Sequence, residues 1–342
     1  MISMEGASIT KLIFHHLNSD ADAKQIFSDA MFHFNDDEQE ETLKKIFLKP
    51  FTNNLTTLEF KHEINLDLNV LFSISKSIFN DEDFINQSKN ICQHLKSVSK
   101  HPNIKSGDVF VLEFDNIVFE NNFYKAIGIY KIENKETFIE TNNNHNNIEL
   151  SFKKGIGNKK LDKACLILFT NEPYTIFLID NVSGETDYWQ NEFVKVDFKK
   201  DNVNNTNQFL SLTKSFVTQQ YPEDFETTKA DQIDLLNRSV EYFKTHETFE
   251  KSEFEQEVLH HEGLINSFQN FNVKYAEENK MELNDSFDIS AQAVKKQARV
   301  FKSVLKLDKN FHVYIHGNRE LIEQGVDADG RKYYKLYFEN EA

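Results

Sequence analysis

The sequence contains few of the residues that interrupt or cross-link a chain. Its 342 residues include four prolines, ten glycines and two cysteines, Cys92 and Cys165. So few prolines and glycines favour abundant regular structure, and the two cysteines indicate neither a disulfide framework nor a metal-type pair. No apolar run approaches the roughly 18 residues that a membrane span needs, and no secretory leader opens the sequence. We therefore expect a cytoplasmic protein without membrane contact.

Arginine is also scarce, whereas phenylalanine and acidic residues are plentiful. Only four arginines occur, against 32 phenylalanines, and hydrophobic residues make up 39% of the chain, which excludes general disorder. The net charge of −16 argues against broad, undirected binding to nucleic acid. A local basic patch is still compatible with this charge, because distant acids are screened beyond about 8 Å at physiological salt.

The hydrophobic patterns predict an α+β fold whose N-terminal part combines helices with an antiparallel sheet. Helical periodicity covers residues 36–47, 65–79 and 81–100. Alternating residues predict strands at 9–17, 109–114, 123–132, 137–141 and 148–152, and apolar runs predict buried strands at 164–169 and 175–180. An Asn-rich loop is expected at residues 142–147, between two of these consecutive strands.

A polar, turn-rich stretch at residues 199–207 predicts a boundary between two domains, 1–198 and 199–342. Beyond it the pattern is helical and then returns to alternation, so we expect a helical region that ends in a small antiparallel sheet. The predicted helices are 208–219, 231–245, 251–260, 262–278 and 291–299. The predicted strands are 300–307, 311–316 and 331–338, the first two joined by a turn at Asp308-Lys309-Asn310.

The last part of the chain is basic, unlike the rest. Residues 291–338 hold ten Lys/Arg against five acids, and they include three of the four arginines. Arginine and lysine on the outer face of a small sheet suit phosphate binding, although a solvated face balanced by acids elsewhere is the alternative. The candidate contact residues are Lys295, Lys296, Arg299, Lys302, Lys306, Lys309, Arg319, Arg331 and Lys332.

A second basic stretch lies between the predicted strands of the first domain. It carries five lysines against one acid, Asp162, and includes Gly155 and Gly157. A lone Gly-x-Gly is a weak phosphate-loop signal, so a tight turn before a buried strand and a backbone-phosphate contact surface are both open. The candidates are Lys153, Lys154, Lys159, Lys160 and Lys163, and we expect them to form one positive strip with the C-terminal set.

Catalytic patterns are weak. Asp115 with Glu133-Asn134-Lys135 fits the loose Asp…Glu-x-Lys arrangement of metal-dependent nucleases, in which two carboxylates hold Mg²⁺. In a chain so rich in Glu and Lys, this pattern also arises by chance. No Ser/His/Asp, Cys/His or zinc spacing stands out, so we predict no catalytic residue, no metal site and no cofactor.

Several blocks in a fixed order resemble the bacterial nucleoid-associated protein family of the NdpA type. The blocks are GNKKLDKACLIL (157–168), IDNVSGETDYW (179–189), SVLKLDKNFHVYIHG (303–317) and GRKYYKLYF (330–338). This resemblance implies a cytoplasmic protein that localises with the bacterial nucleoid and binds double-stranded DNA. It supplies no catalytic constellation, so no catalytic residue is carried over.

We therefore predict a nucleoid-associated protein that binds double-stranded DNA with little sequence preference through Lys/Arg–phosphate contacts. One alternative is an acidic adaptor that docks on another chromosome-associated protein, and a less favoured one is a metal-dependent nuclease. The sequence makes no prediction of the oligomeric state.

Overall fold

The computed structural model describes residues 2–20, 23–53, 56–144, 147–157, 160–182, 188–279, 281–298, 304–315 and 319–340. The chain divides into two compact units, which we name unit 1 (Met1–Lys199) and unit 2 (Lys200–Ala342). The fold is mixed, with a large antiparallel sheet in the N-terminal part and small antiparallel sheets at the C-terminus, as predicted. Among the described residues, every helix is too short or too polar to span a lipid bilayer.

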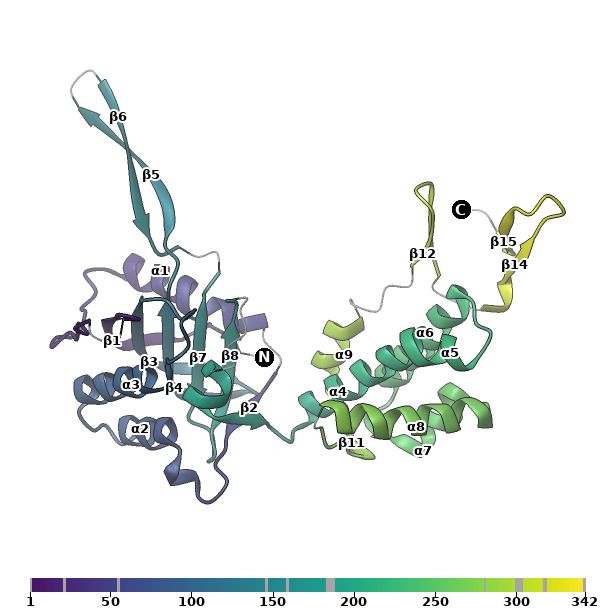
Figure 1. Cartoon of the computed structure of the whole chain (residues 1–342), viewed down its shortest axis with the longest axis horizontal. Helices are drawn as coiled ribbons and strands as arrows, with labels where there is room; N and C mark the ends of the chain where they lie inside the picture. The colour runs from purple at the N-terminus through teal and green to yellow at the C-terminus, as the bar shows by residue number, and fades with distance from the viewer. Residues whose placement is uncertain are drawn as a thin grey trace. The chain divides into compact units, whose positions relative to one another are not determined.

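Unit 1 is built around a seven-stranded antiparallel sheet with the spatial order β1-β3-β4-β7-β8-β2-β9 (Figure 1). Its strands are β1 Ser8–Leu17, β2 Leu58–Phe60, β3 Gly107–Phe119, β4 Asn122–Ile132, β7 Lys163–Leu168, β8 Thr175–Asp180 and β9 Val196–Phe198. The five longer strands confirm the prediction from sequence. The short strands β2 and β9 were not predicted, because three residues are too few to show an alternation.

Helices cover both faces of this sheet, which explains why β7 is buried along its whole length. On one face α2 (Val70–Phe79) and α3 (Phe84–Val98) pack through residues such as Phe72 and Ile91. On the other face α1 (Asp37–Phe47) and the 3₁₀ turn after it pack through Phe47 and Phe51. All three helices were predicted, and each begins after an Asn or Asp that caps it.

The strands β5 (Glu136–Asn144) and β6 (Asn147–Gly155) pair only with each other and form a separate hairpin. Both strands were predicted, but the Asn-rich loop at residues 142–147 is a correction. The strands continue through Asn142, Asn143 and Asn144, and the register pairs Asn144 with Asn147. Backbone pairing between the two strands has overridden the turn preference of Asn142, Asn143 and Asn144.

Unit 2 begins with helices around a core rich in phenylalanine. The helices are α4 Asn202–Ser215, α5 Tyr221–Asp224, α6 Lys229–Thr245, α7 Lys251–Phe254, α8 Glu262–Asn279 and α9 Ala291–Ala298. A two-stranded sheet pairs β10 (Thr248–Glu250) with β11 (Ser286–Asp288). Phe209 and Phe249, with ring centroids 4.1 Å apart, lie in this core.

The predicted break at residues 199–207 is in large part helical, which is a second correction. Helix α4 begins at Asn202, because the side chain of Asp201 accepts a hydrogen bond from the Asn204 amide at 2.9 Å. Thr206 is buried and donates to the Asn202 carbonyl at 2.7 Å, so tertiary packing outweighs the low helix propensity of this stretch.

The chain ends in two hairpins, whereas one small sheet was predicted. The first pairs β12 (Val304–Leu307) with β13 (Phe311–Tyr314), and the second pairs β14 (Ile322–Val326) with β15 (Lys332–Leu336). Strand β14 was not predicted, because Glu323, Gln324 and Gly325 interrupt its apolar pattern. The expected hairpin around Asp308-Lys309-Asn310 and the expected last strand are both confirmed.

Candidate nucleic-acid interface

The basic C-terminal segment, Ala291 to Phe338, is held on unit 2 by the inner face of the β12–β13 hairpin. Leu305 packs in a buried cluster with Ala230 and Ile233 of α6. The side-chain amide of Asn237, also on α6, donates to the Ile315 carbonyl at 3.1 Å. The alternation seen in the sequence therefore places apolar residues against the helix and leaves the other face to solvent.

The outer face of this hairpin is basic and aromatic, as the alternation predicts. Lys306 lies opposite His312, and Val304 lies opposite Tyr314, whose side chain is 65% exposed. Lys309 is exposed in the turn. Within the described part of the chain, Lys306 and Lys309 form no ion pair, so their charges are available to a ligand.

Helix α9 adds two further lysines to the same segment. Its N-terminus is capped by Ser290, whose hydroxyl accepts from the Ala293 amide at 3.4 Å. Val294 is buried, whereas Lys295 and Lys296 in the last turn are exposed. Figure 1 shows α9, the β12–β13 hairpin and the β14–β15 hairpin along one side of unit 2.

The arginines of this segment are engaged in local ion pairs. Arg319 donates through Nε to Asp231 at 2.7 Å and also bonds the Ile322 carbonyl, which ties the second hairpin to α6. Arg331 pairs with Asp329 at 2.6 Å in an exposed position. Lys332 is exposed and has no ion-pair partner among the described residues. The lysines, more than the arginines, therefore supply uncompensated charge.

The side-chain carboxylate of Asp231 joins the start of α6 to Arg319, the residue that precedes the β14–β15 hairpin. It serves the capping box of α6, in which Asp231 and Thr228 exchange hydrogen bonds, and it binds Arg319 as well. Burial acts to raise the pKa of Asp231, but the hydrogen bonds from Thr228 and Arg319 outweigh burial and lower it. Arg319 therefore has a structural role in the free protein.

The basic stretch of unit 1 does not form a single surface. Lys153 and Lys154 lie on β6, where Lys153 pairs with Glu140 at 2.5 Å. Lys160 is exposed ahead of β7. Lys163 is only 2% exposed, and both carboxylate oxygens of Asp180 lie 2.7 Å from its ammonium group. Lys163 is thus an internal residue and cannot meet a phosphate at the surface.

Three of the sequence candidates, Lys159, Arg299 and Lys302, lie outside the described residues. The remaining candidates fall in two different units, Lys153 to Lys163 in unit 1 and Lys295 to Lys332 in unit 2. Their meeting in one positive strip stays a prediction.

A network of buried charge at the edge of unit 1 was missed by the sequence analysis. The Lys131 ammonium, 2% exposed as a residue, donates to Glu133 at 2.7 Å and to the Lys105 carbonyl at 2.9 Å. Lys131 and Lys163 both lie over the ring of Tyr188, at 5.9 and 5.0 Å from its centroid. Burial lowers the pKa of Lys131, while the hydrogen bond that its ammonium donates to Glu133 opposes the change. The only signal in the sequence was the presence of lysines at positions where the alternation of strand residues places the side chain in the interior of unit 1.

The nuclease arrangement suggested by Asp115 and Glu133 is not formed. The register places Ile132 opposite Asp108, so Glu133 lies eight strand positions from Asp115, roughly 27 Å along the strands. The carboxylate near Lys135 is Asp108, which pairs with Lys135 at 2.6 Å and with His16 at 2.7 Å. Both Asp108 oxygens are engaged, and the Glu133 side chain is buried against Lys131. These residues therefore do not present two free carboxylates to Mg²⁺.

One group within the described ranges has the geometry of a metal site. The ligand atoms of His246, Glu253 and Glu257 lie within 4.8 Å of one another, and the nitrogen Nε2 of His246 is 3.5 Å from the Glu257 carboxylate. Imidazole with carboxylates is a ligand set that zinc accepts. The Glu-x-x-x-Glu spacing was a weak sequence signal, because such pairs are common on acidic helices.

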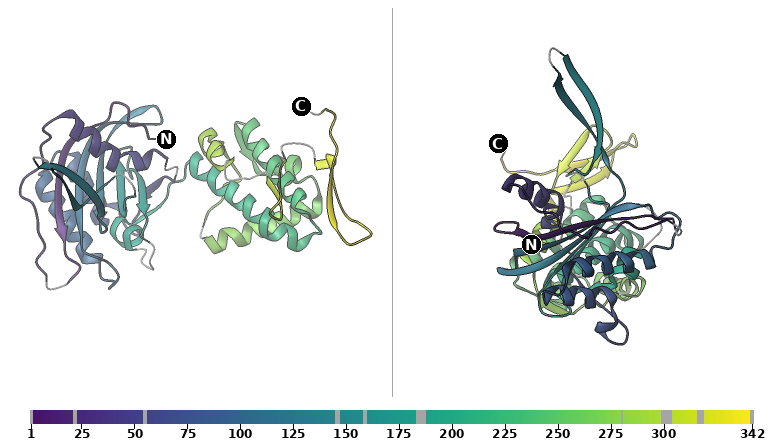
Figure 2. Two further views of the ribbon diagram at one scale, coloured as in Figure 1. Left: turned by 90° about the horizontal axis from the view of Figure 1, so that it is seen from above. Right: turned by 90° about the vertical axis from the view of Figure 1, so that its left-hand side faces the viewer.

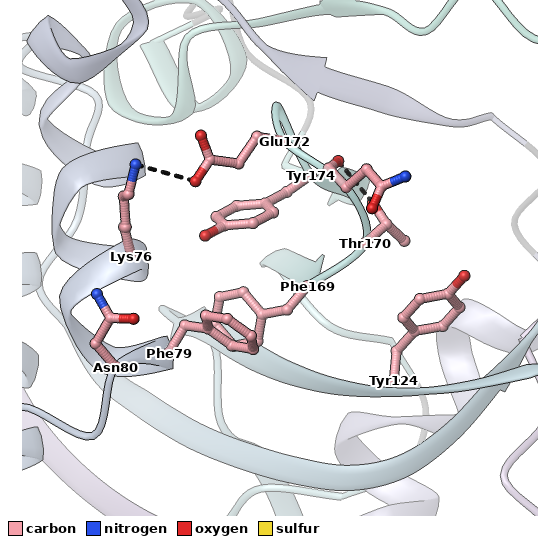
Figure 3. Close-up of a pocket in the computed structure, with 9 residues that line it drawn as sticks. Lys76, Phe79, Asn80, Tyr124, Phe169, Thr170, Glu172 and Tyr174 are labelled. Atoms are coloured by element: carbon pink, nitrogen blue, oxygen red, sulfur yellow. Dashed lines mark hydrogen bonds and ion pairs between the residues drawn. The ribbon is translucent and has the colours of Figure 1, made fainter.

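An aromatic pocket of about 390 Å³ opens in unit 1 between α2, β4 and the loop before β8 (Figure 3). Phe79 and Phe169 form its floor, with ring centroids 4.8 Å apart, and Tyr174 stands beside Phe169. Lys76 and Glu172 pair at 3.0 Å on the rim. Burial, with a contribution from Glu172, raises the pKa of Tyr174 to about 12. The pocket thus offers flat aromatic surfaces beside a charged rim, and the Tyr174 hydroxyl in it is neutral at neutral pH.

A comparison with curated proteins gives no match. A family model described as Nucleoid-associated protein YejK, in contrast, matches residues 13–332. Because this match covers nearly the whole chain, the protein belongs to that family of nucleoid-associated proteins. The resemblance seen in the sequence blocks is confirmed, and with it a nucleoid-associated role.

Proposed function

We propose that this member of the nucleoid-associated protein YejK family binds double-stranded DNA with little sequence preference, in the cytoplasm and at the nucleoid. The contacts would be made by lysines of the basic C-terminal segment of unit 2. Lysine ammonium groups bind phosphate as point charges and read no base edges, so binding tolerates any sequence.

The observation that carries this proposal is the separation of charge within unit 2. Residues 200–290, which precede the segment, hold eighteen acids against eight cations. The basic C-terminal segment that follows holds ten Lys/Arg against five acids. Four of its lysines are exposed and form no ion pair with any described residue. These lysines are Lys295, Lys306, Lys309 and Lys332.

Aromatic residues accompany the lysines and fit the same role. Tyr314 of β13 is 65% exposed on the face that carries Lys306, and His312 lies on the same face. A hydroxyl and an imidazole can donate to phosphate or sugar oxygens beside a lysine contact. Arg299 and Lys302 belong to the same basic segment of the sequence, and we include them in the proposed contact set.

In unit 1, we include the exposed residues Lys154 and Lys160 as secondary phosphate contacts. We exclude Lys163 from the contact set, because its charge is buried against Asp180. We expect only a minor contribution from Lys153, because it is paired with Glu140. Arg319 and Arg331 would contribute only after giving up their carboxylate partners.

The direct test is the affinity of the purified chain for several unrelated duplexes over a range of salt concentrations. Each phosphate neutralised makes the slope of log K against log salt steeper by about 0.9, so the four exposed lysines Lys295, Lys306, Lys309 and Lys332 alone predict a slope of about −3.6, and each further contact steepens it. The slope should be equal for all duplexes. An affinity that ignores salt, or that belongs to a single sequence, would overturn the proposal.

A second candidate function is an adaptor that docks on a basic, chromosome-associated protein, and the acidity of residues 200–290 favours it. Here the partner would bring the chain to the nucleoid. Capture of that partner would survive nuclease treatment, whereas an association that runs only through DNA would be lost.

A further inference from the structure

The β5–β6 hairpin is an arm that leaves the body of unit 1, and within the described residues its two strands pair only with each other. Its strands belong to no larger sheet, and Figures 1 and 2 show it standing clear of the other elements of that unit. A two-stranded hairpin alone is marginally stable in water. An arm of this kind is therefore expected to gain stability from a surface that covers it.

One face of the arm is apolar and exposed. The register places Ile139 opposite Phe152, and Leu150 and Ile148 continue the same face along β6. The side chains of these residues are exposed by 63%, 70%, 56% and 76% in that order. Their combined area is on the order of 500 Å², which lies within the roughly 300–600 Å² of the largest apolar patch on a typical monomer, a patch that is often functional.

The charged residues of the arm lie almost entirely on its other face. Glu136, Glu140, Glu149 and Lys153 share that face, because each alternates with a member of the apolar set. On the apolar face the one charge among the described residues is Lys154, at the base of the arm. In a chain with 55 acidic residues, this face carries none.

We propose that this apolar face packs against the same face of a second copy of the chain and forms a two-fold symmetric dimer. A two-fold axis brings a surface onto itself, which requires that the surface does not repel itself. This face is neutral along Ile139, Leu150, Phe152 and Ile148, so it meets that condition. The apolar side chains of this face offer no contact to the phosphates of a duplex, and Glu136, Glu140 and Glu149 on the opposite face of the arm would repel it.

The area of the apolar face of the arm is consistent with a second copy of the chain as the partner. Two arms about 30 Å long, packed face to face about 10 Å apart, bury both apolar faces. The total is about 1,000 Å², which is near the lower limit for a specific interface. The dimer is thus of moderate affinity, and it gives a DNA-binding chain two basic segments per particle. The proposal does not rest on DNA binding, because the arm carries none of the lysines of the C-terminal segment.

The test uses the full chain and two matched variants, Phe152→Lys and Ser151→Lys, in sedimentation equilibrium at concentrations up to about 100 µM. Both add one positive charge to β6, but on opposite faces. We expect a dimer for the wild type and for Ser151→Lys, and dimerisation weakened about 100-fold by Phe152→Lys, since the change occurs in both copies. A monomeric wild type, or equal behaviour of the two variants, overturns the proposal.

Cysteine cross-linking gives a second readout that does not depend on affinity. Cys92 and Cys165 are buried, so a new surface cysteine is the reactive one. Leu150 lies near the middle of β6, close to where the two-fold axis would pass. A short bis-maleimide linker, which can span sheets about 10 Å apart, should join Leu150→Cys into a covalent dimer and should not join Ser151→Cys. Equal cross-linking of the two would contradict the face-to-face packing, whatever the outcome of DNA-binding assays.

Discussion

Lys163 at the start of β7 and Asp180 at the end of β8 face each other across the register, with the ammonium 2.7 Å from both carboxylate oxygens. The lysine side chain is 3% exposed and the aspartate 33%. A residue that the sequence places in a basic surface stretch is therefore a partner in an internal ion pair. Removing one member of such a pair leaves the other charge without compensation.

We predict that Asp180→Asn destabilises unit 1 by about 2–4 kcal/mol, because it leaves the Lys163 ammonium buried and unpaired. The matched control is Asp197→Asn, which breaks the exposed pair of Asp197 with Lys61 at 3.1 Å. That change should cost about 0.5 kcal/mol or less. Urea unfolding followed by the fluorescence of Trp189, the one tryptophan and a buried residue of unit 1, measures both. Equal losses would contradict a structural role for Lys163.

The stability of unit 1 should fall as the pH is lowered from about 6.5 to 4, because of His15. Burial, assisted by the charge of Lys89, lowers the pKa of His15 to about 4. The ring accepts from the Ser28 amide at 3.1 Å and donates to the Ser88 hydroxyl at 2.9 Å, which fixes the neutral form. In the unfolded chain the pKa is about 6.5, so the unfolded state takes up the proton first.

The loss from this group should reach about 3 kcal/mol at pH 4. In His15→Gln the pH slope between 6.5 and 4 should be reduced, whereas His62→Gln, at an exposed histidine, should retain the wild-type slope. The measurement is urea unfolding at a series of pH values. An unchanged slope in His15→Gln would show that His15 takes up its proton in the folded chain as well.

Tyr130→Phe should stabilise unit 1 by about 1–3 kcal/mol. The ring is fully buried and packs against Phe47 with centroids 4.6 Å apart, but its hydroxyl has no hydrogen-bond partner among the described residues. Removing the hydroxyl removes the cost of burying it and keeps the ring contacts. Tyr124→Phe, at a half-buried tyrosine of the same strand, should change stability little. A less stable Tyr130→Phe would reveal a partner for the hydroxyl.

Much of the fold follows from the sequence because its elements are long and strongly patterned. The apolar runs of β7 and β8 predict strands buried on both faces, and alternation about Asp308-Lys309-Asn310 predicts both the hairpin and its outward lysine. Tertiary context decides the rest. The signal for α4 is a single capping residue, Asp201, ahead of a run of asparagines that local propensity places in a turn.

In the candidate interface, too, some residues can be assigned from local sequence patterns and others cannot. Lys306 can be assigned to a solvent-exposed face from the strand period alone. Lys163 cannot, because its partner Asp180 is seventeen residues away and becomes a neighbour only through the β7–β8 register. The ion pair of Arg319 with Asp231 spans 88 residues and has no local signature in the sequence.

Reversing the charge of the exposed hairpin lysines tests the proposed DNA contact. Lys306→Glu with Lys309→Glu should weaken binding to all duplexes alike, because phosphate contacts are lost and no base contact is. Folding should be unaffected, since both side chains are exposed and lie outside the buried cluster with α6. As a control, Lys274→Glu makes the same change on α8, where the side chain is 68% exposed.

The most direct measurement is the salt dependence of DNA affinity for this double variant beside the wild type and the Lys274→Glu control. The account predicts that the slope of log K against log salt becomes shallower by about 1.8 in the double variant, from two phosphate contacts, and stays unchanged in the control. Identical slopes for all three proteins would contradict the claim that the C-terminal hairpin of unit 2 holds the DNA backbone.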